Sequence, residues 1–529
     1  MAERSPASLE EQARKLLEDL VAIDTTNLED PGNGRMEKRN YLRAAQYISA
    51  RGKDLGLGAR VWDAREELKD GKDRFAEPRP NVVIDLDRGR SQTLLILAHF
   101  DVVPVPEEQL ERWKSPPHSL RLREDGRYYG RGAADDIGSG VVPGLLALDA
   151  LRRRSDLPVN VRFIACCDEE TGGTGGIEAL REHDDALPRD SPERILTAEM
   201  ALIPDGSPFV GAGSSGVSFV DVSLTQGTRV TEYLRVADAL ADFHSIASTW
   251  TSALPSPPEP EGKPPNAYIL GRATPTLEHL DVREGHGKGA RLVRIHSNSL
   301  AANQIPASVS LTFAGSGPEL QALRTFLSGT VRVPYRLTFT ETPATLTVQV
   351  VGVSGHGGYP HRARNPVPES TRLLLDGLQQ GILAEGEVAT GTMTLDLRSP
   401  PEMEAEQALA IFRNYFLRLE NEVPGATAVV PPGRERSGYF VSPQNPRILL
   451  LQKTYEEVAG RPIGIYGEYG GTDASALRKI QTPKGDPLPV VVLGAMDPPA
   501  HIHDAEESID PRYLNEVTRL LVRWVETFG

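Results

Sequence analysis

The chain has 529 residues, of which 39% are hydrophobic and 25% charged, and its formal net charge is -15. This length predicts two or more domains, because single hydrophobic cores stop growing at roughly 250–300 residues. The negative charge argues against a general nucleic-acid binder or a binder of anionic membranes, since both need a basic surface.

The N-terminal segment lacks the continuous apolar stretch of a signal peptide, and nowhere does the chain approach the roughly 18 apolar residues of a membrane span. The only two cysteines, Cys166 and Cys167, are neighbours, and a disulfide between adjacent residues is geometrically poor. Unpaired cysteines fit a reducing compartment. We therefore expect a cytoplasmic protein without membrane partners.

The first and last parts of the chain predict an α/β layer. Ser8 and Glu11 are spaced as in a capping box, and apolar residues follow at helical spacing. Strands are then expected at 81–86, 93–98 and 159–167, and the apolar run 488–493 resembles another strand. Helices are expected at 138–153, at 445–459 and from Asp510. Alternation of strands and helices predicts a largely parallel central sheet flanked by helices.

The middle of the chain changes character and predicts an inserted α+β domain. Alternating strands are expected at 217–224, 307–314, 345–352 and 392–398, and helices at 317–328, 366–382 and 402–421. Two similar sets of elements, at about 215–330 and 331–435, predict a doubled unit. We therefore divide the chain into 1–214 and 436–529, which form one domain, and the insertion 215–435. The proline-rich segment 254–265 is expected to be a solvated loop.

Several acidic or histidine-bearing segments follow predicted strands, where ligands bind in open α/β sheets. His99 and Asp101 are two residues apart, so both project from one side of an extended chain. A metal-binding histidine usually donates its other ring N–H to a carboxylate, and Asp101 is placed to accept it. The pair alone is equally compatible with a histidine and an aspartate that stabilise the end of a strand.

Two pairs of adjacent carboxylates stand out. Asp135 and Asp136 follow a glycine-rich turn and precede a predicted helix, where an N-cap aspartate is the simpler explanation. Glu169 and Glu170 follow a strand, and neighbouring carboxylates are tolerated best where a cation or a proton separates their roles. One can bind a metal while the other polarises a water molecule. A solvated acidic turn is the alternative.

Two further segments carry candidate ligands. Asp205 ends an apolar run and, taken alone, fits a turn aspartate. His501 and His503 precede the terminal helix. Imidazole and carboxylate ligands together suit zinc, with manganese or cobalt as rarer occupants.

Together these segments resemble the co-catalytic zinc peptidase and amidohydrolase family, to which carboxypeptidase G, aminoacylase-1 and carnosinase belong. The matching motifs are an H-x-D after a strand, GRGA-x-D, a Glu–Glu pair, an aspartate after a strand and a late H-x-x-x-E. They occur in that order between residues 99 and 507. The resemblance implies a zinc-peptidase catalytic domain interrupted by an inserted lid domain.

The resemblance also implies a role for each residue of these motifs. Two Zn²⁺ ions, or Mn²⁺ or Co²⁺, would be bound by His99, Asp135, Glu170, Asp205 and His503, with Asp135 bridging both. Asp101 would orient His99, and Glu169 would be the general base. His503 is preferred over His501 because only His503 has a glutamate, Glu507, four residues later.

The activity implied is that of a metallopeptidase, a hydrolase that attacks an amide bond with a metal-activated hydroxide. A dipeptidase or related exopeptidase that acts on small peptides with a free carboxylate, as a carboxypeptidase does, is the first hypothesis. An N-acyl-amino-acid deacylase, such as an aminoacylase, is the second. A non-catalytic binding protein of the same fold is a remote third hypothesis, since it predicts a broken ligand set and the set is complete.

Lid residues complete the predicted site. His356 lies in a segment that resembles the family's lid motif, and Asn303 lies in an N-x-I-P segment that here precedes His356 by 53 residues. This order, with the doubled lid, resembles single-chain bacterial dipeptidases, in which one lid supplies both groups. It implies that a monomer is sufficient for activity. Arg398 is the candidate for binding a substrate carboxylate, because its planar fork suits bidentate contacts; a salt bridge at the rim is the alternative.

The segment 467–477 also resembles a family segment at the rim of the site, so Gly471 and Thr472 are candidate substrate contacts. One position departs from the pattern: Ile137 stands where many members carry lysine after the bridging aspartate. The departure leaves the ligands intact but makes specificity rules of the family less safe to transfer.

Overall fold

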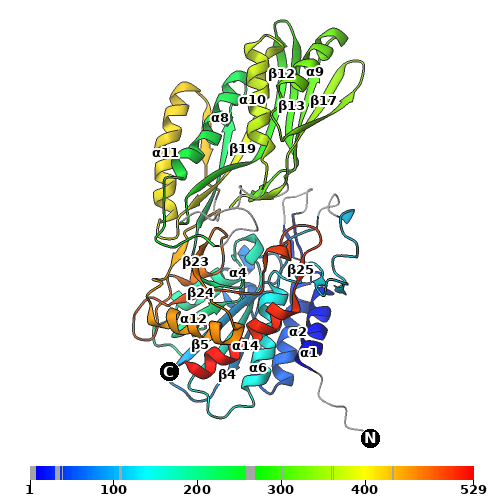
Figure 1. The fold of residues 1–529 in the computed structure, drawn as a ribbon. Helices are drawn as coiled ribbons and strands as arrows, with labels where there is room; N and C mark the ends of the chain where they lie inside the picture. Colours follow the sequence, from blue (N-terminus) through cyan, green and yellow to red (C-terminus); the bar gives the residue numbers. More distant parts are fainter. Residues whose placement is uncertain are drawn as a thin grey trace.

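The computed structural model describes residues 8–29, 36–38, 40–105, 110–257, 268–299, 302–358, 360, 363–431 and 434–528. In this part of the chain, two bodies lie one above the other, and each contains a nine-stranded sheet (Figure 1). The lower body, which we call the catalytic body, carries both ends of the chain, and the upper body, the lid, is formed by the middle of the chain. The division at 214/215 and 435/436 stays a prediction.

The sheet of the catalytic body has the strand order β22-β10-β24-β9-β5-β8-β4-β3, with β23 beside β10. Its strands are β3 Gly58–Asp63, β4 Pro80–Leu86, β5 Thr93–His99, β8 Asn160–Cys166, β9 Met200–Ile203, β10 Val210–Ser214, β22 Tyr439–Phe440, β23 Ile465–Glu468 and β24 Val490–Val492. The central strands β24, β9, β5 and β8 are parallel, whereas β4 and β3 join antiparallel. The prediction of a largely parallel central sheet is therefore confirmed for these four strands, and β4 and β3 extend it on one side as antiparallel neighbours.

Helices cover the catalytic sheet, and α14 contacts α1, α6 and α12. The helices are α1 Leu9–Val21, α2 Tyr41–Asp54, α3 Ala64–Glu67, α4 Gly71–Arg74, α6 Val142–Leu151, α7 Ile177–Asp185, α12 Pro446–Ala459, α13 Ala474–Leu477 and α14 Pro511–Thr527. Ser8 caps α1 by accepting from the Glu11 N–H, as the spacing predicts. The helix predicted at 138–153 begins instead as a π-helical turn, Ile137–Val141.

Short elements make up the rest of the catalytic body. They are β1 Asn27–Glu29, β2 Met36–Lys38, β6 Arg121–Leu122, β7 Tyr128–Tyr129, β25 Ser508–Ile509 and the 3-10 turns Glu169–Thr171 and Pro498–Ala500. Strand β25 pairs with β7, and this pairing brings the chain just after the late histidines beside the start of the GRGA-x-D segment.

The lid sheet has the order β16-β17-β15-β13-β12-β19-β11-β20, with β21 beside β11. Its elements are β11 Gly216–Leu224, α8 Val230–Ala247, β12 Arg272–His286, β13 Ala290–Ser297, β14 Gln304–Ile305, β15 Ser308–Ala314, α9 Gly317–Thr330, β16 Arg336–Glu341, β17 Thr345–Val351, β18 Gly355–His356, α10 Pro366–Gln379, β19 Leu383–Ser399, α11 Ala405–Glu422, β20 Ala426–Val429 and β21 Glu435–Arg436. Strands β14 and β18 form a separate pair.

Each lid strand alternates apolar and polar residues, so the two faces of the sheet differ. Val220 and Val222 of β11 belong to the core that α8 and α11 cover. Val217 and Phe219 belong to the opposite set of alternating residues, on what we call the open face. The open face also carries the arginines that approach the catalytic body.

Strands from both predicted halves of the lid belong to this one sheet. Strand β12 pairs with β19, and β15 pairs with β17. The doubled unit therefore stays a prediction, and 215–330 and 331–435 do not form separate sheets. Helix α8 was not predicted, and residues 258–265 of the proline-rich segment lie outside the described residues. Among the described helices, none combines the length and apolar composition needed to span a membrane.

Candidate metal centre

The parallel strands β8, β5 and β9 bring candidate ligands to one edge of the catalytic sheet. His99 is the last residue of β5, Glu169 and Glu170 begin the 3-10 turn after β8, and Asp205 follows β9. Because the carboxyl ends of parallel strands meet at the same edge, segments far apart in the sequence converge here.

Asp135 lies between the two histidines. Its Oδ1 is 3.1 Å from Nε2 of His99, and its Oδ2 is 3.0 Å from Nε2 of His503. Oε2 of Glu170 is 3.1 Å from Nε2 of His503, and Oδ1 of Asp205 is 3.8 Å from Nε2 of His99. The structure thus brings all five predicted ligands together, with one carboxylate in the middle.

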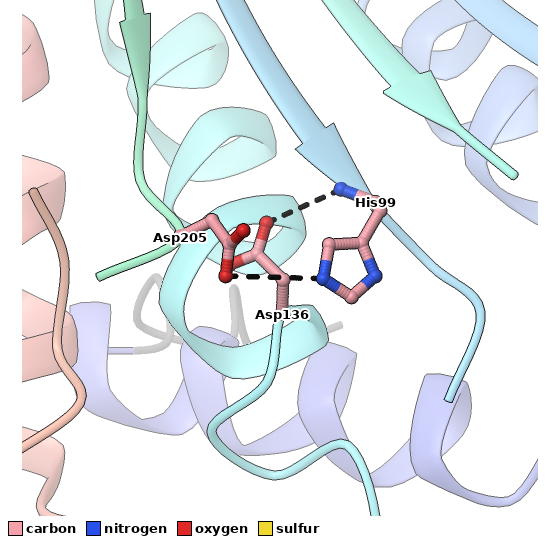
Figure 2. A group of neighbouring side chains, drawn as sticks. All are labelled: His99, Asp136 and Asp205. Carbon is pink, nitrogen blue, oxygen red and sulfur yellow. Dashed lines mark hydrogen bonds and ion pairs between the residues drawn. The ribbon is translucent and has the colours of Figure 1, made fainter. Parts of the chain in front are cut away.

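A sixth residue, Asp136, joins the group on one side. Figure 2 shows His99, Asp136 and Asp205 gathered at the end of β5, and their potential ligand atoms all lie within 4.8 Å of one another. His99, Asp135 and Glu170 form a second such group. Oδ2 of Asp136 accepts the backbone N–H of His99 at 3.2 Å, so at least one of its oxygens already holds the backbone at the end of β5.

The carboxylates around His99 and His503 favour positive charge at this site. Burial lowers the pKa of His99, but contacts with Asp101, Asp135 and Asp205 outweigh it and raise that pKa well above its usual value. The pKa of His503 rises in the same way beside Glu170 and Asp135. Burial opposes ionisation of Asp135, yet the two histidines lower its pKa. The cluster of carboxylates therefore attracts cations to the two Nε2 atoms.

The donor set fits divalent metal ions. Two imidazole nitrogens and the oxygens of Asp135, Glu170 and Asp205 converge, which is the mixed nitrogen and oxygen chemistry that zinc accepts. Oε1 of Glu170 is buried and has no hydrogen-bond partner among the described residues. A buried carboxylate oxygen without a partner is costly unless a cation or a proton satisfies it.

Asp101 supports this site mainly through the backbone. Its Oδ1 and Oδ2 accept the N–H groups of Glu169 and Glu170, each at 3.1 Å. Nδ1 of His99 lies 3.1 Å from the carbonyl oxygen of Asp101 and 3.5 Å from its carboxylate. The spacing predicts that the Asp101 carboxylate orients His99, and in the structure the Asp101 carbonyl oxygen lies closer to Nδ1 of His99 than the carboxylate does. The carboxylate also holds the turn that carries both glutamates.

Glu507 holds the loop of Asp135, a role that the sequence did not reveal. Its Oε1 accepts the N–H groups of Ala134 and Asp135 at 2.9 and 3.0 Å, and its Oε2 accepts from Arg131 at 2.6 Å. Both charged side chains are 1% exposed. The late H-x-x-x-E motif therefore contributes a candidate metal-binding histidine, His503, and, four residues later, the glutamate that holds the loop of Asp135.

The loop of His503 is held in an unusual conformation. His501, His503 and Glu506 have φ values of 52°, 62° and 65°, in the left-handed region that few non-glycine residues adopt. Such conformations persist only where surroundings enforce them, and here Arg112 pairs with Asp504 of this loop. His501 is exposed, in agreement with the choice of His503.

Glu169, the predicted base, lies next to an arginine of the lid. Its Oε1 lies 3.7 Å from Nη1 of Arg436 in β21. Burial and the nearby Asp473 raise the pKa of Glu169 well above its usual value. Burial also raises the pKa of Asp473 to about 7, although Arg436 opposes this rise. Asp473 lies in the segment 467–477 that resembles a rim segment of the family, whereas Arg436 was not among the predicted site residues, because no local motif connects it to Glu169.

The structure places the two predicted lid segments side by side. Strands β14 and β18 pair with Gln304 opposite His356, and the Asn303 carbonyl accepts the Gly357 N–H at 2.7 Å. A Cβ at Gly357 would come 2.1 Å from Oδ2 of Asp396, so this pair lies over the open face beside Asp396. The side chain of His356 is outside the described residues.

The guanidinium of Arg398 pairs with an aspartate of its own strand. Its Nε and Nη2 donate to the two carboxylate oxygens of Asp396 at 2.6 and 2.9 Å, and Nη1 lies 3.4 Å from the Tyr469 carbonyl. The pair is buried rather than at the rim. In the segment 467–477, the Thr472 hydroxyl accepts the Ala474 N–H, and Gly471 is exposed.

Comparison with known proteins adds the family. The sequence model of peptidase family M20/M25/M40 matches residues 95–527. Similar solved structures include that of human carnosine dipeptidase 1, which has a TM-score of 0.53 and 16% sequence identity and covers 98% of this chain and 96% of its own. An M20 family metallo-carboxypeptidase of Sulfolobus solfataricus has a TM-score of 0.54 and 15% sequence identity and covers 98% of both chains. At this identity, both show the fold alone.

Curated relatives match over different lengths. An uncharacterized metallohydrolase of Methanocaldococcus jannaschii is 29% identical over 225 residues, which are 40% of this chain, and the chain spans about half, 50%, of that relative. The cysteinylglycine-S-conjugate dipeptidase of Corynebacterium striatum is 22% identical over 92% of this chain and 90% of its own length. The human N-fatty-acyl-amino acid synthase/hydrolase PM20D1 is 48% identical over 85 residues, 16% of each protein.

Proposed function

Because the chain belongs to peptidase family M20/M25/M40, a family of metallopeptidases, we propose that it is a metal-dependent hydrolase that cleaves the amide bond of dipeptides or other small peptides. The observation that carries this proposal is the position of Asp135, whose two oxygens lie 3.1 and 3.0 Å from His99 and His503. A carboxylate placed between two imidazoles is what a pair of neighbouring metal ions would require.

We assign five residues to the metals. His99 and Asp205 would hold one ion, Glu170 and His503 the other, and Asp135 would contact both. Asp136 is the alternative partner of Asp205, but it already accepts the His99 N–H, so we assign it to support of the backbone. Zinc suits this donor set, and manganese or cobalt are the alternative occupants.

When bound, such ions would supply Lewis acidity, which polarises the oxygen atoms placed against them. The protein's own contribution is proton transfer. Glu169 lies beside the ligands, and in its carboxylate form it would accept a proton from the attacking water. Because burial raises its pKa, it would hold this proton and then deliver it to the leaving nitrogen. Asp101 fixes the backbone of Glu169 for that task.

Two substrate classes fit this chemistry. The dipeptidase of Corynebacterium striatum matches 92% of this chain and supports dipeptides. The identity of 48% to the human N-fatty-acyl-amino acid enzyme, confined to 85 residues, supports N-acyl amino acids as the second candidate. Both classes release an amino acid through cleavage of one amide bond.

A panel of dipeptides, N-acetyl amino acids and N-fatty-acyl amino acids, assayed with the metal-loaded protein, tests the proposal. We expect dipeptides to be hydrolysed with the highest kcat/KM. Turnover of N-acyl amino acids alone would select the second candidate. Absence of turnover on the whole panel, with metals bound, would reject both.

We also propose that one lid serves its own active site, because Asn303 and the backbone of His356 lie together in one chain. Sedimentation of the active enzyme tests this. An active monomer supports the proposal. Rescue of an inactive His356→Ala chain by mixing it with an inactive Glu169→Gln chain would show instead that the lid acts on a partner.

A further inference from the structure

The two bodies are joined by two chain crossovers that touch each other. The first is Ser215, between β10 and β11, and the second is residues 437–438, between β21 and β22. A Cβ built at Gly438 would lie 2.1 Å from the carbonyl oxygen of Ser214 and 2.9 Å from the backbone nitrogen of Gly216. Two short crossovers in contact form a narrow junction, and a few residues of this kind are enough to act as a hinge.

A third connection comes from the lid segment between α8 and β12. Its two ends run side by side as a narrow arm. The Ser252 N–H donates to the Ile269 carbonyl oxygen at 2.9 Å, and the Ile269 N–H donates to the Leu254 carbonyl oxygen at 3.0 Å. We call residues 251–257 and 268–270 the strap.

The strap packs on strands β10 and β23 of the catalytic body. The Gly467 N–H donates to the Pro255 carbonyl oxygen at 3.0 Å, and both Leu254 and Ile269 are buried. A Cβ built at Gly467 would lie 2.8 Å from Cγ1 of Ile269 and 3.2 Å from Cβ of Leu254. One built at Gly213 would lie 2.6 Å from Cδ1 of Leu254. Glycine at both positions therefore lets two aliphatic side chains of the lid lie directly on strands of the catalytic body.

The strap is also bonded to the rest of the lid. Oε1 of Glu402, in the loop before α11, accepts the Ser252 hydroxyl at 2.9 Å and the Ala253 N–H at 2.8 Å. The strap is thus held by both bodies. A lid that swings about the two crossovers must withdraw Leu254 and Ile269 from the catalytic body and expose their apolar surface to water, which is unfavourable.

We propose that the strap keeps the lid in one orientation over the catalytic body, so that turnover proceeds without a rigid-body swing of the lid. Domains joined by a small polar interface usually move relative to each other. The strap opposes that motion, because it adds a buried apolar contact beside the two crossovers. This inference concerns the position of the lid and holds for either candidate substrate class.

Distances between spin labels on the two bodies test this proposal. Cys166 and Cys167 are buried, so labels attach to cysteines introduced at the exposed Asp190 of the catalytic body and the exposed Arg413 of α11. For the metal-loaded full chain, we expect one narrow distance distribution by pulsed electron paramagnetic resonance, unchanged when amino acid products are added. A broad distribution, or a shift on addition of products, would overturn the proposal.

Release of the strap should free the lid. The double variant Leu254→Ala with Ile269→Ala should broaden the distribution and add longer distances. The control is Leu323→Ala with Leu327→Ala, which removes two buried side chains from the lid core under α9, away from the catalytic body. It should keep the narrow distribution. Equal broadening in both double variants would show that general loss of lid stability, and not the strap, sets the orientation.

A disulfide across the strap gives a second test that does not weaken the fold. The 3.2 Å between Cβ of Leu254 and a Cβ built at Gly467 is close to the roughly 3.5–4.5 Å of a disulfide. We expect the oxidised Leu254→Cys, Gly467→Cys enzyme to hydrolyse its best substrate as fast as the same preparation after reduction. Activity that is lost on oxidation and restored on reduction would show that the strap detaches during turnover, and the proposal would be wrong. Absence of activity in the wild-type enzyme would instead reject the proposed function, and the label distances would still decide the role of the strap.

Discussion

The edge of the catalytic sheet and the open face of the lid carry opposite charge. At the sheet edge, the carboxylates of Asp135, Glu170 and Asp205 surround two histidines and favour a cation. On the lid, arginines stand in a row, and Asp396 neutralises one of them. Carboxylates therefore gather where a cation would bind, whereas guanidinium groups of the lid lie against the catalytic body at Tyr469 and Glu169.

The two regions also differ in how their residues are assembled. Each candidate ligand of the metal centre lies in a short motif that follows a strand of the parallel centre or in a loop that packs on it. The lid row joins Arg272, Arg398 and Arg436, which lie far apart in the sequence and meet only through antiparallel register. The first arrangement leaves a local trace in the sequence, and the second does not.

Replacement of Glu169 by Gln is expected to give the largest effect. The amide cannot accept a proton, so kcat should fall by roughly 10²- to 10⁴-fold. Asp101 would still hold the backbone of this turn, so metal content should stay near the wild-type value. Initial rates and metal analysis of the same preparations check both statements. Normal activity in this variant, with the exposed Glu193→Gln as control, would remove Glu169 from the role of base.

The candidate ligands could be predicted from the sequence because each sits in an ordered local motif, and the central strands because their apolar runs are long. Glu507 was recognised only as a marker of His503, since its contacts with Ala134 and Asp135 arise from tertiary structure. Arg436 carries no local signal at all. Helix α8 does carry a local signal, because Val230, Tyr233 and Ala237 repeat at helical spacing, although this helix was not predicted.

Arg398 was predicted to bind a substrate carboxylate or to form a salt bridge at the rim, and in the structure its guanidinium pairs with a buried aspartate. The sequence predicts an arginine near the site. It does not show that the guanidinium of this arginine pairs with Asp396, two residues earlier on the same face of β19. A buried ion pair and a substrate-binding arginine have the same local pattern. Only the neighbours on other strands distinguish them.

Arg398→Met sharpens the contrast on the lid side. It leaves the carboxylate of Asp396 buried without its partner, which should cost roughly 3–5 kcal/mol of stability. The double variant Asp396→Leu with Arg398→Met should recover most of that loss, because burial of the ion pair is itself expensive. Unfolding in urea measures both. The control is Arg272→Met, which removes a guanidinium that lies over the ring of Tyr469. A single variant as stable as this control would show that the pair is not a buried structural contact.

Glu278 predicts a pH effect in the lid that is independent of the metal centre. It is 2% exposed, and Tyr233 lies close enough to its carboxylate to oppose part of the effect of burial on its pKa. Burial raises its pKa from 4.5 to about 7. Below pH 4.5 the group is protonated in both the folded and unfolded states. Stability therefore falls as pH rises from about 4.5 to 7 and then stays lower, by roughly 3 kcal/mol.

Glu278→Gln should abolish this dependence. Relative to wild type, the variant should gain stability at pH 8 and gain little at pH 4.5, as measured by urea unfolding at both values. The exposed Glu341→Gln is the matched control on β16 and should show no such difference. An equal effect of Glu278→Gln at both pH values would mean that the folded lid does not retain this proton.

The smallest effect is expected at the support of the metal centre. Glu507→Gln keeps the shape of the side chain but weakens its contacts with the Asp135 loop and leaves Arg131 without its buried partner. Replacement of such supporting groups typically lowers metal affinity 10- to 100-fold. Competition with a zinc chelator measures this. Asp504→Asn on the same loop is the control, because it breaks only the more exposed pair with Arg112 and should change affinity little. Equal losses in both variants would mean that the loop as a whole, and not the Glu507 contacts, positions Asp135.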